Sequence, residues 1–334
     1  MTLSLPPLPA IPVVDLHVDT PWKVHFKGRS LDLVEGHATP KTLGAGGYRG
    51  IVYPIYLADY LNDGHPRIAD ADAVLATIRK LVARHDILAW APGQPGYTGP
   101  LSPGTIGVFV AIEGAGAFAD DITQIDRFIA AGVRLVGPVH AANNALATSA
   151  TGKPSPNRHA KPAGLTPLGR TFCERVYAAG ALIDVSHMST AAFDDLEPIA
   201  KKYRAPIVAT HSNAHALAKH PRNLSDRQLR VIAATGGVAG LNVYRPFVSR
   251  GKKVSLRDVV AQVRHMVKVA GVEHVAIGSD YDGGTPVRAL RDASRWPRLV
   301  AALRDKGFSD ADLRKIFAEN ALRVLAWKPA ASRP

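Results

Sequence analysis

Eight short apolar segments rich in Val and Ile recur along this chain of 334 residues, and longer segments with helical periodicity separate most of them. Nearly continuous apolar segments are typical of parallel strands that are covered on both faces. Strands that alternate with amphipathic helices favour an α/β fold, and eight such strands predict a (β/α)8 TIM barrel. The apolar segments span residues 11–19, 50–57, 105–114, 133–140, 181–187, 206–212, 237–244 and 274–280.

An open, doubly wound sheet is the alternative architecture. It would favour a glycine-rich phosphate loop after the first strand, but the first apolar segment continues as DLHVDTPW, without a GxGxxG pattern. We therefore predict one barrel domain over residues 1–334, closed by C-terminal helices at about 294–327. The segment 149–167, rich in Pro, Gly and Ser, follows the fourth strand, where a loop could cover the carboxyl end of the barrel.

The formal net charge of +13 raises the alternative of a non-enzymatic protein that binds nucleic acid. The basic residues are scattered singly among Ala, Leu and Val, however, so the sequence favours a solvated basic surface and no nucleic-acid partner. Cys173 is the single cysteine, which excludes an internal disulfide and a thiolate zinc site. The N-terminal sequence has no signal-peptide pattern, and no stretch of 18 apolar residues occurs, so we expect a cytoplasmic protein without a membrane partner.

Most of the predicted strands end in a residue that can bind a metal ion or transfer a proton. In a barrel the carboxyl ends of all strands meet at one rim, where barrel enzymes place their chemistry. An imidazole or carboxylate at the end of an apolar segment is costly to bury alone, so seven such residues at matching positions indicate one shared site. These residues are His17, Asp19, Glu113, His140, His187, His211 and Asp280.

This set of side chains suits a hydrolase with two metal ions. Imidazole and carboxylate ligands without thiolate fit Zn²⁺, Mn²⁺ or a similar cation. The period of a strand places His17 and Asp19 on one face, where both can bind the same ion. The Glu113 carboxylate can bridge two ions, and His187 and His211 can hold the second. Two such ions about 3.5–4 Å apart bind a shared hydroxide and polarise a carbonyl.

These residues lie in motifs that resemble those of the membrane dipeptidase (renal dipeptidase) family of binuclear zinc peptidases, peptidase family M19, in a soluble bacterial form. The motifs are DLHVDTPW, AIEGAGAF, LIDVSHMS, ATHSNAHALAKHPRNLSD, HVAIGSDYDG and ENALRVL, and they occur in family order from about residue 15 to 325. The resemblance implies a metal-dependent, amidohydrolase-like barrel with two Zn²⁺ ions per subunit, or Mn²⁺ or Co²⁺ in their place. Leu16 and Val18 stand where the family motif often has Gly and Asn.

The same resemblance implies a role for each matching residue. The five metal ligands would be those assigned above, with Glu113 as the bridge. His140 would hydrogen-bond the scissile carbonyl or its developing oxyanion, and Arg222 of HPRN would bind the terminal carboxylate of the substrate. Asp280 would take a proton from the bridging water and pass it to the leaving amine. Tyr244 ends the seventh strand, and its position at the rim predicts contact with the substrate.

The function implied by the resemblance is that of a metallodipeptidase, in which a metal-bridging hydroxide attacks the peptide bond of a dipeptide that can carry a D-residue at its C-terminal position. A deacylase that acts on N-acyl-D-amino acids is the alternative at the same site, because a free carboxylate is the feature that Arg222 would recognise in both substrates. A homodimer is common in the family and is compatible with this chain.

Overall fold

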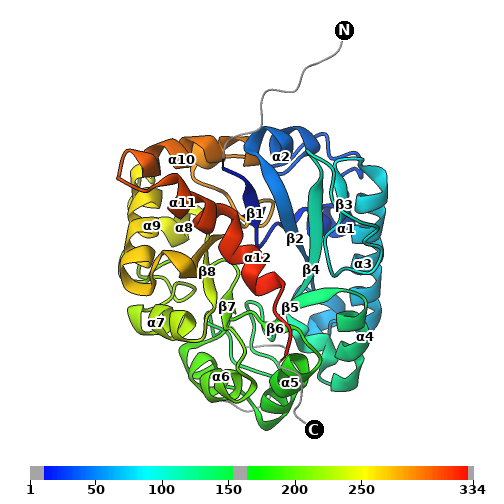
Figure 1. The fold of residues 1–334 in the computed structure, drawn as a ribbon. Coiled ribbons are helices and arrows are strands. Elements are labelled where there is room, and N and C mark those ends of the chain that lie inside the picture. The colour runs from blue at the N-terminus through cyan, green and yellow to red at the C-terminus, as the bar shows by residue number, and fades with distance from the viewer. Residues whose placement is uncertain (1–10, 153–163, 330–334) are drawn as a thin grey trace.

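The computed structural model describes residues 11–152 and 164–329, and eight parallel strands form its central ring (Figure 1). Neighbouring strands follow the order β6-β5-β4-β2-β1-β9-β8-β7, and a parallel bridge between Asp184 and Val208 joins the ends of this series. The fold is the predicted (β/α)8 barrel. Its strands are β1 (Val13–Asp15), β2 (Tyr48–Tyr56), β4 (Ile106–Glu113), β5 (Val133–Gly137), β6 (Leu182–Ile183), β7 (Val208–Ala209), β8 (Val238–Leu241) and β9 (Val275–Ile277).

A ninth strand, β3 (Leu88–Trp90), lies outside the ring and was not predicted. It pairs in parallel with the start of β4, where Leu88 lies opposite Ile106. Three residues between Ile87 and Ala91 are too few to show a strand period, so only the partner strand makes this segment extended.

Helices surround the ring (Figure 1), and each of the sequence segments with helical periodicity, at 70–85, 121–132, 168–180, 191–203, 225–236, 256–271 and 296–307, forms one. They are α3 (Ile68–Arg84), α4 (Ile125–Ala130), α5 (Pro167–Ala178), α6 (Thr190–Tyr203), α7 (Asp226–Ala234), α9 (Leu256–Ala270) and α10 (Trp296–Arg304). Three further helices were not predicted, namely α1 (Thr20–Lys27), α2 (Pro40–Gly46) and α8 (Arg245–Val248). All three have Pro at the first or second position, which suits the start of a helix. They are too short, however, for apolar periodicity to be detected in the sequence.

The C-terminal helices cover the amino-terminal end of the barrel. Asn320 donates hydrogen bonds to the carbonyls of Val272 and Val275 at the start of β9, and Arg134 near the start of β5 donates to Leu325. The last of the predicted closing helices, which the sequence places at 309–327, is interrupted. Its parts α11 (Asp310–Arg314) and α12 (Asn320–Leu325) flank the π-helix η7 (Lys315–Glu319). In Figure 1 α12 crosses the ring, so the opposite rim is the end that remains for a site.

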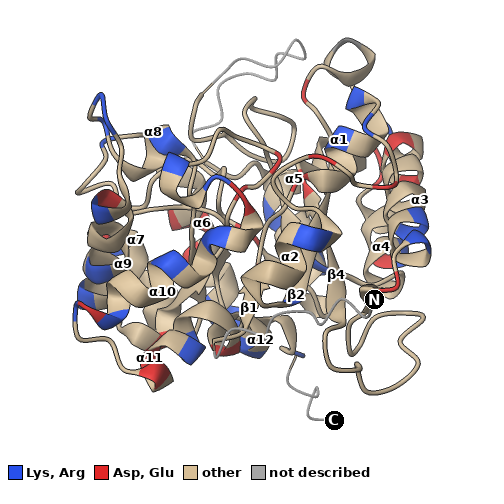
Figure 2. Ribbon diagram, turned by 90° about the horizontal axis from the view of Figure 1, so that it is seen from above, with Lys and Arg blue, Asp and Glu red and all other residues tan. Residues whose placement is uncertain are grey.

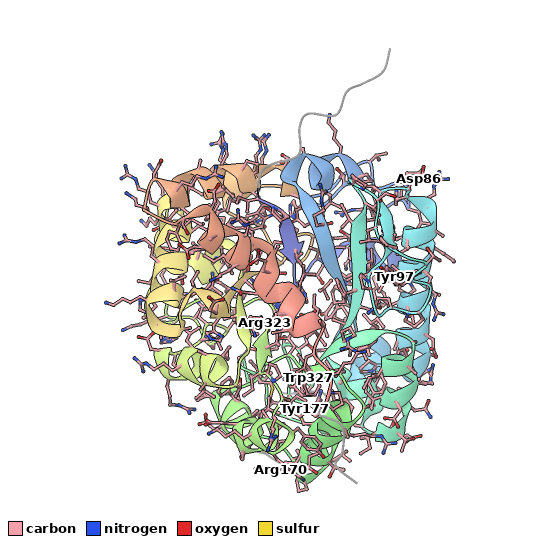
Figure 3. The ribbon with its side chains drawn as sticks, viewed as in Figure 1. Asp86, Tyr97, Arg170, Tyr177, Arg323 and Trp327 are labelled. Atoms are coloured by element: carbon pink, nitrogen blue, oxygen red, sulfur yellow. The ribbon has the colours of Figure 1, made fainter. Side chains whose placement is uncertain are left out.

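Strands and helices share one continuous hydrophobic core, which supports the proposal of a single domain. At its edge Tyr177 of α5 packs edge-on against Trp327 with ring centroids 6.3 Å apart (Figure 3). Lys and Arg are spread over the outer helices with Asp and Glu among them (Figure 2). No helix in the described ranges is long and apolar enough to cross a membrane.

A buried chain of hydrogen bonds joins the first strand to the C-terminal helices. The Tyr48 hydroxyl donates to Asp15 Oδ2 at 2.8 Å and accepts from Trp296 Nε1 at 2.8 Å. Asp15 Oδ1 accepts from the backbone N–H of Ser279 at 2.8 Å, which ties β1 to the segment after β9. All of these side chains are buried, so a missing partner here could not be replaced by bulk water.

We predict that Tyr48→Phe lowers the free energy of unfolding by about 1–3 kcal/mol, because it removes a donor from Asp15 and an acceptor from Trp296. Tyr53→Phe is the matched control: Tyr53 lies on the same strand, is equally buried, and its hydroxyl has no hydrogen-bond partner in the described part of the chain. Urea unfolding of both variants measures the difference. Equal stabilities would show that the Asp15–Tyr48–Trp296 chain contributes nothing.

Candidate metal centre and substrate pocket

His17 and Asp19 lie just beyond β1 and face each other at the carboxyl end of the barrel. Their side chains are buried, and His17 Nε2 lies 3.5 Å from Asp19 Oδ2. The backbone around them is fixed because Asp15 Oδ1 accepts the N–H of His17 and Val18 bridges to Tyr281. The predicted alternation is therefore confirmed in space, with both side chains on one face.

Glu113 is the last residue of β4 and contacts both groups of predicted ligands. Its Oε2 lies 3.5 Å from His17 Nε2, while its Oε1 lies 3.0 Å from His187 Nε2 and 3.6 Å from His211 Nε2. The two imidazole nitrogens are 3.1 Å apart. The structure therefore brings together the five side chains that the sequence grouped. One oxygen of Glu113 faces His17, and the other faces His187 and His211.

The donor atoms fit two metal ions in their spacing. Ligands at about 2.0–2.2 Å from a tetrahedral ion lie about 3.3–3.6 Å from one another. The donor pairs above are separated by 3.0 to 3.6 Å, in the groups His17–Asp19–Glu113 and Glu113–His187–His211. Both ring nitrogens of His17 are buried and have no hydrogen-bond partner among the described residues, an arrangement that a bound cation would satisfy.

The electrostatics of this cluster also favour a cation. Burial alone would lower the pKa of His17, but the Glu113 and Asp19 carboxylates raise it well above its ordinary value. Burial alone would raise the pKa of Glu113, but His17 holds it well below. Burial and the charge of Arg222 lower the pKa values of His187 and His211 well below that of free imidazole, and the charge of His17 lowers that of His211 further. These two rings therefore stay neutral and able to bind a metal.

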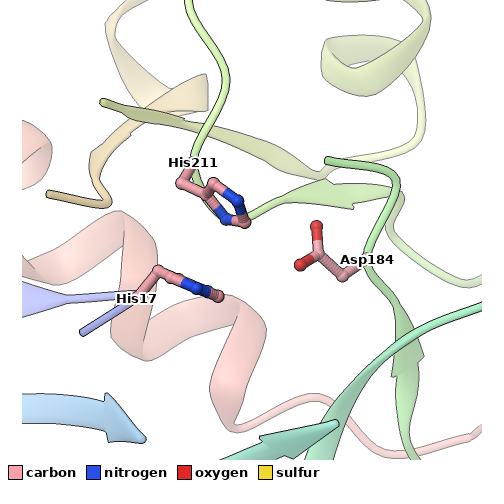
Figure 4. Close-up of side chains that lie close together, drawn as sticks. All are labelled: His17, Asp184 and His211. Carbon is pink, nitrogen blue, oxygen red and sulfur yellow. The ribbon is translucent and has the colours of Figure 1, made fainter. Parts of the chain in front are cut away.

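Asp184 forms a third close group with His17 and His211 (Figure 4), but its oxygens already have donors. Oδ1 accepts from the N–H groups of Ser186 and Thr210, and Oδ2 accepts from Thr210 Oγ1 at 2.6 Å. Thr210 Oγ1 lies 2.7 Å from His211 Nδ1, and since it donates to Asp184 it accepts from His211. Asp184 therefore acts through Thr210 to leave the lone pair of His211 on Nε2, facing Glu113.

The cluster lies at the base of a pocket of about 640 Å³. His140, which follows β5, lines this pocket and stacks on His187 with ring centroids 4.3 Å apart. Its Nδ1 lies 2.9 Å from Asp59 Oδ2, which also accepts the N–H of Ala141. Asp59 was not singled out from the sequence, because it lies 81 positions from His140 and in no motif.

Arg222 is buried beside the metal cluster and has no carboxylate within salt-bridge distance in the described structure. Its guanidinium donates only weakly, to Ser212 Oγ at 3.2 Å and the His211 carbonyl at 3.5 Å, and its Nε has no partner. It lies over the Phe247 ring at 5.3 Å, and burial lowers its pKa to about 10. A buried cation with unused donors is the expected form of an anion site.

Asp280 follows β9 and lines the same pocket, with Asn242 Nδ2 donating to its Oδ2 at 2.9 Å. Burial, reinforced by the charge of Asp19, raises its pKa to about 8. Gly283 leaves room for both carboxylates, since a Cβ there would lie 2.2 Å from Asp19 Oδ2 and 2.3 Å from Asp280 Oδ1. Asn242 and Gly283 are further site residues that the sequence reading missed.

The other predicted features fall into three groups. Tyr244 lines the pocket and packs edge-on against Phe247 at 4.9 Å, so it is placed at the rim as predicted. Leu16 and Val18 are fully buried in the hydrophobic core, so the substituted positions of the first motif do not face the metal cluster. The central part of the predicted covering loop, residues 153–163, lies outside the described residues.

An α/β barrel with imidazole and carboxylate donors at the carboxyl ends of its strands belongs to the class of metal-dependent barrel hydrolases. The family model of the membrane dipeptidases, peptidase family M19, matches residues 8–332. The chain therefore belongs to this family and is a hydrolase.

Known proteins agree with this assignment. The chain resembles a metallopeptidase from Rhodobacter sphaeroides, solved with a phosphinate mimic of the dipeptide L-Ala-D-Ala (TM-score 0.80, 26% identity, 96% of this chain and 100% of that chain covered). It also resembles the probable dipeptidase PvdM from Pseudomonas aeruginosa (TM-score 0.78, 25% identity, 95% of each chain). An uncharacterised protein in the pqqA 5′ region of Klebsiella pneumoniae is 40% identical over 218 residues, 64% of this chain and 79% of that protein. Family and neighbours support metallodipeptidase activity.

We predict that Thr210→Val lowers the affinity for Zn²⁺ by about 10- to 100-fold, because it removes the hydroxyl that fixes the tautomer of His211. Thr210→Ser keeps the hydroxyl and is the matched control. Competition with a chromogenic chelator measures the affinity, and circular dichroism confirms that both variants are folded. A Zn²⁺ affinity for Thr210→Val equal to that of the wild type would contradict the Asp184–Thr210–His211 arrangement.

Proposed function

We propose that this protein is a dipeptidase with two metal ions per subunit, which cleaves dipeptides with a free C-terminal carboxylate and accepts a D-residue at that position. The observation that carries this proposal is the buried, unpaired guanidinium of Arg222 beside the metal cluster. Support for the D-residue comes from the Rhodobacter sphaeroides metallopeptidase, whose bound ligand mimics L-Ala-D-Ala.

Five residues would hold the ions, with Glu113 between the His17–Asp19 pair and the His187–His211 pair. We propose Zn²⁺ at both positions, with Mn²⁺ or Co²⁺ as substitutes, because imidazole and carboxylate ligands accept all three. When bound, such ions supply a nucleophilic hydroxide at neutral pH and polarise the carbonyl that it attacks. The residues of the chain have the remaining tasks of binding the substrate, orienting it and moving protons.

Arg222 orients the substrate. Its two terminal nitrogens have only long contacts, at 3.2 and 3.5 Å, so a carboxylate can form shorter, bidentate bonds with them. Because the guanidinium adjoins His211, a carboxylate bound there leaves the neighbouring peptide bond close to the metal cluster. Tyr244 and Phe247 would contact the C-terminal residue, since both line the pocket next to Arg222.

His140 and Asp280 would act on the reacting atoms. Asp59 accepts from His140 Nδ1, so His140 would donate from Nε2 to the carbonyl oxygen of the substrate as an imidazolium, whose charge the Asp59 carboxylate balances. Asp280 would accept the proton of the attacking water and transfer it to the leaving amine.

We predict that Arg222→Lys lowers kcat/KM for a dipeptide by about 10- to 100-fold, because Lys cannot form the bidentate pair. The matched control is the same dipeptide with a C-terminal amide, which lacks the carboxylate. Wild type should lose a similar factor on the amide, and the variant should barely distinguish the two substrates. If the variant still discriminates as strongly as the wild type, Arg222 does not bind the carboxylate.

We predict that Asp280→Asn lowers kcat by about 10²-fold or more, the scale of general acid–base catalysis. Asn can still accept the Asn242 hydrogen bond, so the loop should keep its structure. Steady-state kinetics give kcat, and metal analysis checks that the variant binds as much metal as the wild type. A near-normal kcat with full metal content would remove Asp280 from this role.

Metal removal tests the proposal as a whole. Dialysis against a chelator should abolish hydrolysis of L,L and L,D dipeptides, and Zn²⁺ should restore it, because the chain then lacks the ions that activate water. Metal analysis of the reconstituted protein should give two ions per subunit. Undiminished turnover by the metal-free protein would refute the metallodipeptidase proposal.

A further inference from the structure

The pocket has a second cation, Lys23, in a wall that the reaction described above does not use. Lys23 lies in α1, immediately after the metal-ligand segment, and its N–H donates to the carbonyl of Asp19. Its ammonium lies 4.3 Å above the Trp22 ring, a contact that positions the charge without neutralising it. No carboxylate in the described structure lies within salt-bridge distance of Lys23.

Lys23 and Arg222 reach the pocket from well-separated parts of the rim. Lys23 follows β1 and Arg222 belongs to the loop after β7, and these strands are three places apart in the ring of eight. Lys23 lies near Asp19 in the first ligand group, whereas Arg222 contacts His211 in the second. A substrate with its C-terminal carboxylate on Arg222 and its peptide bond at the metal cluster therefore extends its acyl half toward Lys23.

Within residues 11–152 and 164–329, the acyl side of the pocket has no free carboxylate that could receive the ammonium of an ordinary dipeptide. Asp282 lies close to Lys23 but is fully committed: it is buried and paired with Arg29 at 2.7 Å. It also accepts from Thr20 Oγ1 at 2.7 Å and from the N–H of His37 at 2.9 Å. The other acidic side chains lining the pocket, Asp19, Glu113 and Asp280, belong to the metal cluster and its proton-transfer residue. Among the described residues that line the pocket, Lys23 is the lysine or arginine that remains for the acyl half once Arg222 is assigned to the C-terminal carboxylate.

We propose that Lys23 selects substrates whose acyl half carries a carboxylate, either as an acidic N-terminal residue or as a dicarboxylic acyl group on an amino acid. This inference rests on the proposed function and names its substrate class. The carboxylate would pair with the Lys23 ammonium at the mouth of the pocket, where the Trp22 ring restricts the lysine and so reduces the entropy lost on binding.

The test compares L-Glu-D-Ala with L-Gln-D-Ala, which have nearly the same shape and differ in one charge. Wild-type protein loaded with Zn²⁺ should show a kcat/KM about two- to fivefold higher for the Glu substrate, the scale of a partly exposed ion pair. Lys23→Gln should bring this ratio close to one, and Lys23→Glu should bring it below one. The preference should also weaken as the salt concentration rises.

Lys27 provides the matched control variant. It also lies over the Trp22 ring, at 5.2 Å, but it does not line the pocket, so Lys27→Gln should keep the Glu preference of the wild type. A ratio near one in the wild type, or one that Lys27→Gln lowers as much as Lys23→Gln does, would overturn the proposal. If the wild type cleaves both substrates equally, the role of Lys23 is overturned and the dipeptidase function stands. If the metal-loaded protein cleaves neither substrate, both the role of Lys23 and the dipeptidase function are overturned.

N-glutaryl-D-alanine distinguishes the two sources of the carboxylate, because it matches L-Glu-D-Ala but lacks the ammonium. A higher kcat/KM for the glutaryl compound assigns the substrate to acylated amino acids, and a lower value assigns it to dipeptides. In either case Lys23→Gln should lower kcat/KM for the better of the two substrates. Failure of that variant to do so would contradict the role of Lys23.

Discussion

The buried carboxylate of Glu113 is the group around which the whole carboxyl end of the barrel is arranged. One of its oxygens faces His17 and the other faces His187 and His211, and each of these contacts comes from a different strand end. An ionised carboxylate at this depth is stable only with positive charge beside it. Closure of the ring brings those strand ends together, so the candidate metal site depends on the closed barrel.

Two buried aspartates extend this arrangement into the surrounding strands. Asp15 accepts N–H groups of His17 and Ser279, and Asp184 accepts those of Ser186 and Thr210. Each carboxylate thus satisfies backbone donors where the strand ladder stops, and each joins two neighbouring strands, β1 to β9 and β6 to β7. The candidate metal ligands therefore project from strand ends whose backbone is held by hydrogen bonds rather than from free loops.

The pocket above this cluster is lined by positively and negatively charged side chains. They differ in how far hydrogen bonds and ion pairs from neighbouring residues satisfy their charge. Asp282 is surrounded by donors and serves the structure, while Arg222 is buried with unused donors, as the proposed role in substrate recognition requires. Residue type alone does not separate these roles, because both side chains are buried and charged. The number and length of the hydrogen bonds around each group make the distinction, and the same comparison singles out Lys23.

The sequence by itself determined the barrel and pointed to the candidate ligands, because apolar strands alternating with helices leave few other folds and a polar residue at a strand end is conspicuous. It could not reveal Asp59, Thr210, Asn242 or Gly283, whose roles depend on partners in other elements, or the short strand β3, which exists only through its pairing with β4. Only the tertiary structure decided these points, since hydrogen-bond saturation and strand pairing arise from contacts between distant segments and leave no local pattern in the chain.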